Sequence, residues 1–283
     1  MRDSLPILEV LRGAESYLAG RGVEHPRLNA EQLLAHALGL KRMELYLQFD
    51  RPLGEAERAP LRELVRRRGA REPLQHILGT VEFHGRTFAC DRRALVPRPE
   101  TEQLVELALD ILKPLPTPTL VDVGTGSGVI ALTLALELPM AEVHATDVSH
   151  DALALAAENA ARHGAATRVN FSRADLLPDD AGTFDLIVAN LPYIPAAEIA
   201  DLSEEVRHDP VTALDGGPDG LGQIRRLVDT AGPHIRTGGA ILLEISHGQG
   251  DAVFAYLEKR KFRDISLRPD YQGIPRFAVG FHG

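Results

Sequence analysis

The chain has 283 residues, of which 44% are hydrophobic and 25% are charged, and its formal net charge at pH 7 is −9. These values are typical of an ordinary soluble globular protein, and no apolar run is long enough to cross a bilayer. The acidic balance argues against a protein that coats nucleic acid, because phosphate binding depends on lysine and arginine.

Residues 1–77 are predicted to form a small helical domain. Apolar residues recur at three- and four-residue spacing in SLPILEVLRGAESYLAGRG, HPRLNAEQLLAHALGL and GEAERAPLRELVRRRGA. Asn29 is the expected N-cap of the second helix, and no pattern before residue 77 indicates a strand. The arginine-rich segment 58–71, with Glu63 as its single acid, is compatible with a solvated helix face or with a docking patch for an acidic partner surface.

Residues 78–98 are predicted to form a hairpin that connects two domains. Apolar residues alternate in ILGTVEFHGRTFACDRRALVPRP, and Gly85 lies at the expected turn. The single cysteine, Cys90, excludes an internal disulfide and is expected to be a packing residue. One cysteine and an N-terminus without the pattern of a signal peptide are consistent with a cytoplasmic location.

Residues 99–283 are predicted to form an α/β domain. After the amphipathic helix ETEQLVELALDILK, strands and helices alternate from residue 119 onward, which is typical of a doubly wound, mostly parallel sheet with helices on both faces. Strands are expected at TLVDV, EVHATD, RVNFSRA, FDLIVAN and GAILLEIS. Two closing strands, DISLRPD and PRFAVGF, have no helix between them and predict an antiparallel edge.

A glycine-rich turn follows the first of these strands, in VDVGTGSGVIAL. Glycines at a strand-to-helix turn let a ligand approach the backbone and the free N–H groups of the helix. The spacing is G-x-G-x-G rather than the G-x-G-x-x-G of dinucleotide-binding proteins, and it fits a ligand without a pyrophosphate, such as S-adenosylmethionine. A plain turn is the alternative. The predicted cofactor-binding residues here are Gly124, Thr125, Gly126, Ser127 and Gly128.

Two aspartates end the next strands. Asp147 lies 19 residues beyond Gly128, where a carboxylate accepts hydrogen bonds from ribose hydroxyls, although it could instead cap the helix that starts at Ser149. Asp175 is a candidate acceptor for an adenine amino group, with a surface-loop aspartate as an almost equal alternative.

The stretch FDLIVANLPYIP ends a buried strand on an amide and then stiffens the chain with prolines. Ligands of doubly wound sheets bind at the carboxyl ends of the strands where the winding reverses, and the strands that end at Gly124 and Asn190 are expected to flank that point. Asn190 would then lie beside the cofactor's methyl group, with Pro192 fixing the backbone and Tyr193 offering a flat apolar wall.

Such a site suits a planar nitrogen nucleophile, either an amide or an exocyclic amine. Its N–H groups would donate to the Asn190 side chain and to a backbone carbonyl, which stabilises the nitrogen as it becomes cationic in the transition state. Positioning of the reactants supplies much of the remaining rate enhancement, on the order of 7–11 kcal/mol. No metal is expected.

The tetrad Asn-Leu-Pro-Tyr at 190–193 resembles the Asn/Asp-Pro-Pro-Tyr motif of S-adenosylmethionine-dependent amino-methyltransferases. The leucine at its second position is more similar to the tetrad of the rRNA dimethyladenosine methyltransferases. Four other stretches resemble signatures of the HemK/PrmC protein-glutamine methyltransferases. They are REPLQHILG (71–79), LVPRPETEQLV (95–105), EVRHDPVTALDGGPDGL (205–221) and LLEISHGQG (242–250).

The HemK/PrmC resemblance implies a class I methyltransferase fold and methylation of the glutamine amide in the Gly-Gly-Gln motif of class-1 peptide chain release factors. By position, residues 124–128, Asp147 and Asn190 would bind S-adenosylmethionine, and Asn190, Leu191, Pro192 and Tyr193 would hold the glutamine amide. The helical domain would contact the release factor. We expect a monomer without direct nucleic-acid or membrane binding.

Two other functions stay open from the sequence. One is an adenine amino-methyltransferase acting on RNA or DNA, and the other is a non-catalytic module that binds the cofactor as a structural ligand. Glu100 and Glu102 are either charged site residues or, more simply, acids that favour a helix N-terminus. The glycines of LDGGPDGL are expected in a loop near the site.

Overall fold

The computed structural model describes residues 4–178 and 180–283. The chain divides into two compact units. The first comprises Met1–Gly79 together with the short segment Ser203–His208, and the second comprises Thr80–Leu202 and Asp209–Gly283. None of the helices in the described ranges has the length and apolar character of a membrane span.

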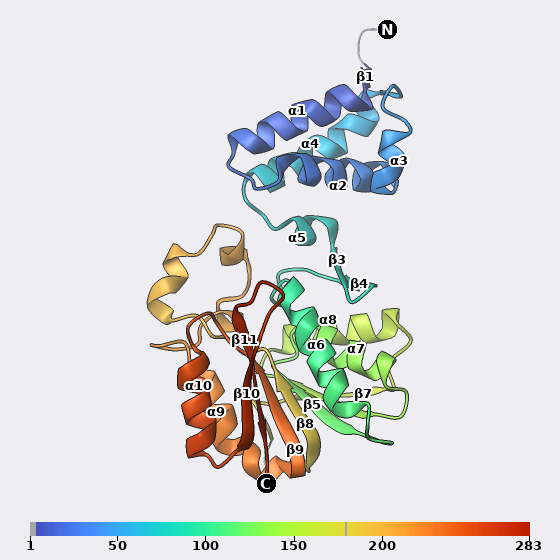
Figure 1. The fold of residues 1–283 in the computed structure, drawn as a ribbon. Helices are drawn as coiled ribbons and strands as arrows, with labels where there is room; N and C mark the ends of the chain where they lie inside the picture. The colour runs from blue at the N-terminus through green and yellow to red at the C-terminus, as the bar shows by residue number, and fades with distance from the viewer. Residues whose placement is uncertain (1–3, 179) are drawn as a thin grey trace. The chain divides into compact units, whose positions relative to one another are not determined.

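The first unit is a cluster of helices around its own apolar core (Figure 1). Its long helices present leucines at helical spacing to this core, for example Leu11 and Leu18 of one helix and Leu33 of the next, all fully buried. The helices are α1 (Ile7–Gly20), α2 (Pro26–Leu38), α3 (Arg42–Tyr46), α4 (Glu55–Gly69) and α5 (Leu74–Leu78).

Two sequence-based predictions for this unit are wrong. A two-residue strand pair, β1 (Leu5–Pro6) with β2 (Pro52–Leu53), lies before residue 77, and it is too short and too proline-rich to leave a pattern. The N-cap of α2 is His25 rather than Asn29, because Pro26 has the fixed φ that suits the first helical position. The Asn29 side chain instead donates to the carbonyl of His25 at 3.1 Å and accepts from Arg68 at 2.7 Å.

Arginines of segment 58–71 form ion pairs inside the first unit. Arg66 pairs with Glu63 on the exposed surface of α4, which agrees with a solvated helix face. Arg68 and Arg71 both bind Glu205, at 3.0 Å and 2.6 Å. These two guanidinium groups therefore hold the segment 203–208 within the helical unit, and they lower the pKa of the Glu205 carboxyl against the opposing effect of its burial.

The second unit is built on a seven-stranded sheet with the order β10-β11-β9-β8-β5-β6-β7 (Figure 1). Neighbouring strands from β9 to β7 run parallel, whereas β11 is antiparallel to both β9 and β10. This confirms the predicted mostly parallel sheet with an antiparallel edge. The strands are β5 (Thr119–Val123), β6 (Glu142–Asp147), β7 (Val169–Arg173), β8 (Phe184–Ala189), β9 (Ile235–Glu244), β10 (Arg263–Pro269) and β11 (Pro275–Phe281).

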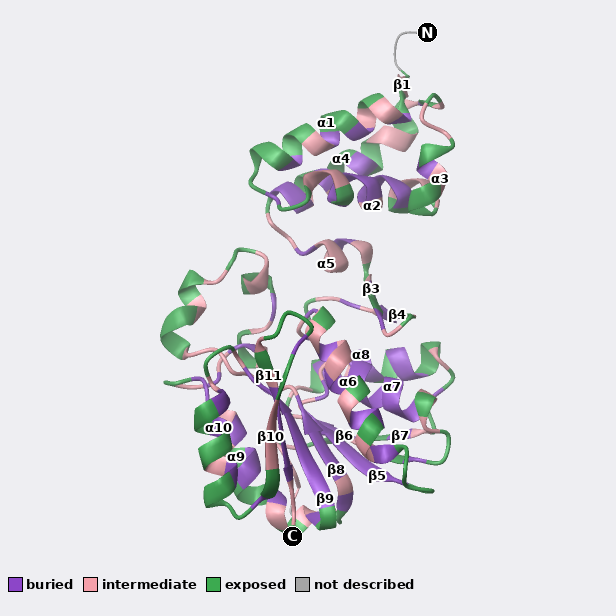
Figure 2. Cartoon of the chain, viewed as in Figure 1, coloured by how far each residue is buried: buried purple, intermediate pink, exposed green. Residues whose placement is uncertain are grey.

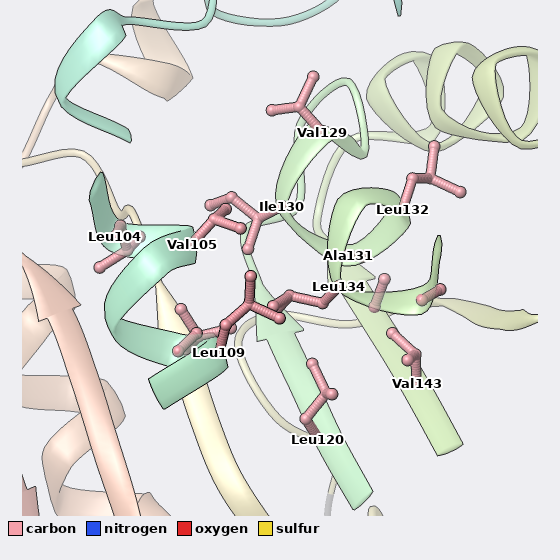
Figure 3. Packing of buried hydrophobic residues seen from close by; sticks show 14 of the residues in the cluster. Leu104, Val105, Leu109, Leu120, Val129, Ile130, Ala131, Leu132, Leu134 and Val143 are labelled. Atoms are coloured by element: carbon pink, nitrogen blue, oxygen red, sulfur yellow. The ribbon is translucent and has the colours of Figure 1, made fainter. Parts of the chain in front are cut away.

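Helices cover both faces of this sheet, and the central strands are buried along their length (Figure 2). One face packs against α6 (Pro99–Leu112), α7 (Val129–Glu137) and α8 (His150–Arg162), and Figure 3 shows part of this cluster around Leu120. The other face packs against α9 (Gly222–Ala231) and α10 (Gly250–Lys259).

Alternation along the central strands assigns their side chains to the two faces. In β8, Leu186 and Val188 join the α6–α7 cluster, whereas Ile187 joins the α9–α10 cluster. In β9, Leu242 lies on the α6–α7 face. The same period of two carries the next polar residues, Asn190 and Glu244, onto the α6–α7 face.

A hairpin precedes the sheet, as its alternating pattern predicts. It pairs β3 (Thr80–Phe83) with β4 (Arg86–Ala89), and both turn residues, His84 and Gly85, have positive φ. Cys90 follows it and packs in the α6–α7 core, where burial raises the pKa of its thiol to about 12. The thiol is therefore a packing group and not a nucleophile at neutral pH.

Candidate active site

Two strand ends meet at the centre of the sheet. β5 and β8 are parallel neighbours, and Val123 is aligned with Ala189. Gly124 and Asn190 therefore leave the sheet side by side at its carboxyl edge. This confirms the prediction that these two strands flank the point where the winding reverses.

The glycine loop after β5 is held in a conformation that other residues rarely adopt. Gly124, Gly126 and Gly128 all have positive φ, of 75°, 55° and 82°. The backbone N–H groups of Gly124 and Thr125 both donate to the carbonyl of Thr146, each at 2.9 Å, which ties the loop to the end of β6.

Asp122 supports this loop from inside the sheet. Its Oδ2 accepts from the Thr125 hydroxyl at 2.7 Å and from the backbone N–H of Ala131 at 3.2 Å. Its Oδ1 is buried and accepts no hydrogen bond from the described residues. Burial of the whole carboxyl raises the pKa of Asp122 to about 7, against the effect of the two hydrogen bonds.

The glycine loop and the tetrad are in direct contact. A Cβ atom on Gly124 would lie 2.9 Å from Cδ2 of Leu191, closer than real Cβ contacts come. Leu191 is buried and belongs to the α9–α10 core. The leucine of the tetrad therefore packs beneath the loop, and the absence of a side chain at position 124 lets the two motifs approach each other.

A cavity opens at this edge of the sheet, lined partly by residues before α6 and after β6. Neither Gly128 nor Tyr193 is among its lining residues: Gly128 caps α7 and faces Ala156, and Tyr193 packs against the α9–α10 core. The predicted site residues that do line the cavity are Gly124, Thr125, Gly126, Ser127, Asp147, Asp175, Asn190, Leu191 and Pro192.

The two aspartates of this edge differ in their surroundings. Asp147 accepts the backbone N–H of Gly126 at 2.9 Å on one oxygen and that of Ser149 at 2.8 Å on the other. The cap of α8 is the Ser149 side chain, so Asp147 does not fill that role. Asp175 is exposed and forms an ion pair with Arg226 at 2.7 Å, as a surface aspartate does.

Asn190 is oriented by a chain of hydrogen bonds. Its Nδ2 donates to the hydroxyl of Thr101 at 3.1 Å, and that hydroxyl donates to a carboxylate oxygen of Glu244 at 2.9 Å. Thr101 and Glu244 are both buried. The Oδ1 of Asn190 accepts no hydrogen bond from residues 4–178 and 180–283, so this oxygen is free to meet a donor in the cavity.

The glycines of LDGGPDGL brace the tetrad through backbone contacts. Ile194 donates to Leu214 at 3.1 Å and accepts from Gly216 at 2.9 Å, forming a short parallel bridge. A Cβ atom on Gly216 would lie 2.8 Å from the Pro192 carbonyl oxygen, and one on Gly220 would lie 2.3 Å from the Tyr193 carbonyl oxygen. The expected loop near the site therefore works as a scaffold in which Gly216 and Gly220 leave no room for a Cβ atom.

Known proteins resemble this chain over nearly its whole length. A family model described as the PrmC N-terminal domain matches residues 9–79, and one described as the Methyltransferase small domain matches residues 102–217. The release factor glutamine methyltransferase of Geobacter sulfurreducens is 44% identical over 97% of this chain and 96% of its own length. The enzyme of that name from Deinococcus radiodurans is 43% identical, over 97% and 98%.

The chain belongs to the release factor glutamine methyltransferase family.

Its fold agrees with that assignment. The ribosomal protein L11 methylase of Lactobacillus delbrueckii subsp. bulgaricus is similar with a TM-score of 0.50 and 26% identity, over 66% of this chain and 81% of that one. The sheet of this family member is thus the class I methyltransferase sheet, preceded by the helical domain that its sequence predicts.

Three residues at this family member's site were not predicted from the sequence. Thr101 lies between Glu100 and Glu102, the two glutamates of PETEQ. These glutamates were expected to favour a helix N-terminus, and both lie in the first turn of α6. Glu244 follows the apolar run of β9, at the strand end where the site lies. An acidic residue at that position is the sequence feature that could have identified it as a site residue. Gln249 donates to the Tyr193 carbonyl at 2.9 Å, a contact between segments far apart in sequence.

Proposed function

We propose that this protein methylates the side-chain amide nitrogen of the glutamine in the Gly-Gly-Gln motif of class-1 peptide chain release factors, with S-adenosylmethionine as the methyl donor. The observation that carries the proposal is the contact between the glycine loop and the tetrad, where the Cβ position of Gly124 comes within 2.9 Å of Leu191. A donor held on the loop and an amide held on the tetrad are thereby neighbours.

The residues of the cavity fit an adenosyl cofactor. The glycine loop leaves room for close backbone approach, and the carboxylate of Asp147 lies at the end of β6 with lone pairs left for two hydroxyls. Val148 and Leu176 add apolar surface beside it. When bound, S-adenosylmethionine supplies an electrophilic methyl group on a sulfonium centre.

The tetrad supplies acceptors for the substrate amide. Asn190 offers its Oδ1, and the backbone carbonyl of Pro192 stands two residues along a stiffened turn. An amide nitrogen is a poor nucleophile because its lone pair is delocalised, so acceptors that grip its two hydrogens stabilise the positive charge that develops on nitrogen. The proton leaves after methyl transfer, and no strong base is required.

Tyr193 supports the site without donating a proton. Its hydroxyl is largely buried, and this burial, together with the nearby carboxyl of Glu244, raises the pKa of the phenol to about 12. The side chain stays neutral at physiological pH and packs against the α9–α10 core. We propose that its ring, packed against that core, supports the end of the tetrad that holds the substrate amide.

The leucine at position 191 takes a packing role where related tetrads carry proline. It is buried under the glycine loop, and the proposed backbone acceptor is the carbonyl of the next residue, Pro192. We therefore expect the geometry of the acceptors to survive the substitution.

We propose that the helical unit, residues 1–77 in our sequence-based division, docks the release factor. We further propose that the protein is a monomer and does not bind nucleic acid directly. The net charge of −9 supports a protein substrate over RNA or DNA. In the same division, residues 78–98 connect it to the methyltransferase domain at 99–283.

The test is methyl transfer from labelled S-adenosylmethionine to a purified release factor, followed by mass spectrometry of the Gly-Gly-Gln peptide. We expect label on that glutamine and none on a release factor in which it is alanine. Label that persists after the exchange, or equal transfer to purified RNA, would reject the proposed substrate.

A further inference from the structure

Two buried polar groups, Thr101 and Glu244, meet the half-buried Asn190 of the tetrad from distant parts of the chain. Thr101 lies in the first turn of α6, Asn190 follows β8 and Glu244 ends β9. β8 and β9 are parallel, with Ala189 aligned with Leu243, so Asn190 and Glu244 stand at the same level of the sheet and on the same face. α6 covers that face and brings Thr101 between them.

The hydrogen bonds of this cluster run in one direction. The Thr101 hydroxyl has a single hydrogen and donates it to Glu244 at 2.9 Å. Toward Asn190 the same hydroxyl is then an acceptor, and it receives Nδ2 at 3.1 Å. The amide of Asn190 has two ends, and an accepting neighbour behind it turns the NH₂ end inward and leaves the oxygen for the cavity.

The opposite orientation of the Asn190 side-chain amide would hinder methyl transfer. If the NH₂ group of Asn190 faced the cavity, it would present hydrogens to the hydrogens of a substrate amide. A donor in that place destabilises the positive charge that forms on nitrogen, whereas an acceptor stabilises it. The catalytic value of Asn190 therefore depends on which way its amide is turned.

We propose that Glu244 and Thr101 are positioning residues that fix the side-chain amide of Asn190 with its oxygen toward the substrate nitrogen. This inference rests on the proposed function for its substrate. It adds two residues to that site, and these act on the reaction through the orientation of Asn190.

The charge on Glu244 determines the direction of the hydrogen bonds that link it to Thr101 and Asn190. An ionised carboxylate can only accept, whereas a protonated one can donate to Thr101 and release the hydroxyl hydrogen toward Asn190. Burial raises the pKa of Glu244 to about 7; the charge of Glu100 on α6 adds to the shift, and the Thr101 hydrogen bond, Arg276 on β11 and the nearby Asn190 amide oppose it. Turnover should thus decline as the pH falls through about 7.

Other ionisable groups face the same carboxyl and need separate control. The pKa of Tyr193, raised to about 12, places the titration of its phenol far above the pH range in which Glu244 titrates. Glu100 remains, and Glu100→Gln is the matched control. This exchange removes a carboxylate from the same turn of α6 but leaves the hydrogen-bond chain intact.

The first experiment compares Thr101→Val with Thr101→Ser on the full chain, using a release factor as substrate. Valine keeps the shape and removes the hydroxyl, so kcat should fall by about tenfold to a hundredfold while KM changes by less than about threefold. Serine keeps the hydroxyl and should restore kcat. Equal loss in both variants would mean a packing role, and an unchanged kcat in the valine variant would overturn the proposal.

The second experiment records kcat against pH between 6 and 8.5 for three forms that all carry Asp122→Asn, because the pKa of Asp122 under the glycine loop is also raised to about 7. The Asp122→Asn parent and its Glu100→Gln derivative should both lose turnover on the acid side of about pH 7, and its Glu244→Gln derivative should show a flat profile. The same inflection in Glu244→Gln would assign the titration to another group and overturn the role of Glu244.

A third readout does not depend on methyl transfer. The side-chain amide NMR signals of Asn190, identified by their loss in Asn190→Ala, should shift with pH around 7 in the wild type and stay constant in Glu244→Gln. If no methyl reaches the release factor but this titration is present, the proposed function fails and the orientation of Asn190 stands. A titration that persists in Glu244→Gln overturns the inference whatever the substrate.

Discussion

Replacement of Gly220 by alanine tests whether the glycine scaffold holds the tetrad in place. Gly220 has a φ of +74°, and its added Cβ would lie 2.3 Å from the carbonyl oxygen of Tyr193 and 2.7 Å from Nε2 of Gln249. Gln249 donates to both the Tyr193 and the Gly220 carbonyls, at 2.9 Å and 3.3 Å. The new methyl group therefore enters the contact that fixes the end of the tetrad.

The size of the effect follows from these distances. Real Cβ atoms essentially never come closer than 3.0 Å, so the Tyr193 backbone must move by at least 3.0 − 2.3 = 0.7 Å. A displacement of about 1 Å costs on the order of a hundredfold in rate when it misplaces reacting groups. The left-handed backbone adds about 1–2 kcal/mol of strain for a residue with a Cβ.

Gly217→Ala is the matched control for this prediction. Gly217 lies in the same loop with a φ of +89°, but its added Cβ would meet nothing closer than Cα of Gly222 at 3.8 Å. It should show the strain alone, as a lower thermal midpoint Tm with near-normal kcat. Gly220→Ala should show the lower Tm and, in addition, a kcat lower by about a hundredfold with release factor as substrate.

Two results would refute this reasoning. A wild-type kcat in Gly220→Ala would mean that the position of the tetrad backbone does not limit the reaction. Equal losses of kcat in Gly217→Ala and Gly220→Ala would attribute the effect to general strain in the loop and not to the contact with Tyr193.

Three further changes probe the cofactor site, the acceptor and the supporting carboxyl. Asn190→Ala should lower kcat by roughly a hundredfold or more and weaken S-adenosylmethionine binding far less, because the acceptor matters most in the transition state; equal losses in kinetics and calorimetry would contradict this. Asp147→Ala should raise the cofactor Kd by about tenfold or more through lost charge-assisted hydrogen bonds, and an unchanged Kd would remove Asp147 from the site. Asp122→Asn should flatten the pH dependence of stability. With its pKa raised from 3.8 to about 7, wild-type Asp122 binds protons more readily in the folded state, so the free energy of unfolding falls as pH rises through that window. Urea unfolding at pH 5 and pH 8 measures the slope, and an unchanged slope in the variant would contradict the assignment.

The sequence by itself determined the elements, because the relevant signals are local. The buried runs TLVDV and FDLIVA, each followed by a turn or a polar residue, coincide with β5 and β8. Their alternation with amphipathic helices restricts the sheet to a parallel, doubly wound form, in which the ends of these two strands lie at the ligand edge. Asn190 and the glycine loop were therefore predictable as neighbours.

Only the tertiary structure decided which side chains support that edge. Thr101, Glu244 and Gln249 reach the tetrad from α6, from the end of β9 and from the turn before α10, and no sequence spacing encodes those contacts. Segment 203–208 belongs to the helical unit through Glu205, although its neighbours in sequence belong to the second unit. Local patterns fix the path of the backbone, whereas the direction of a buried hydrogen-bond chain depends on groups that meet only once the sheet has formed.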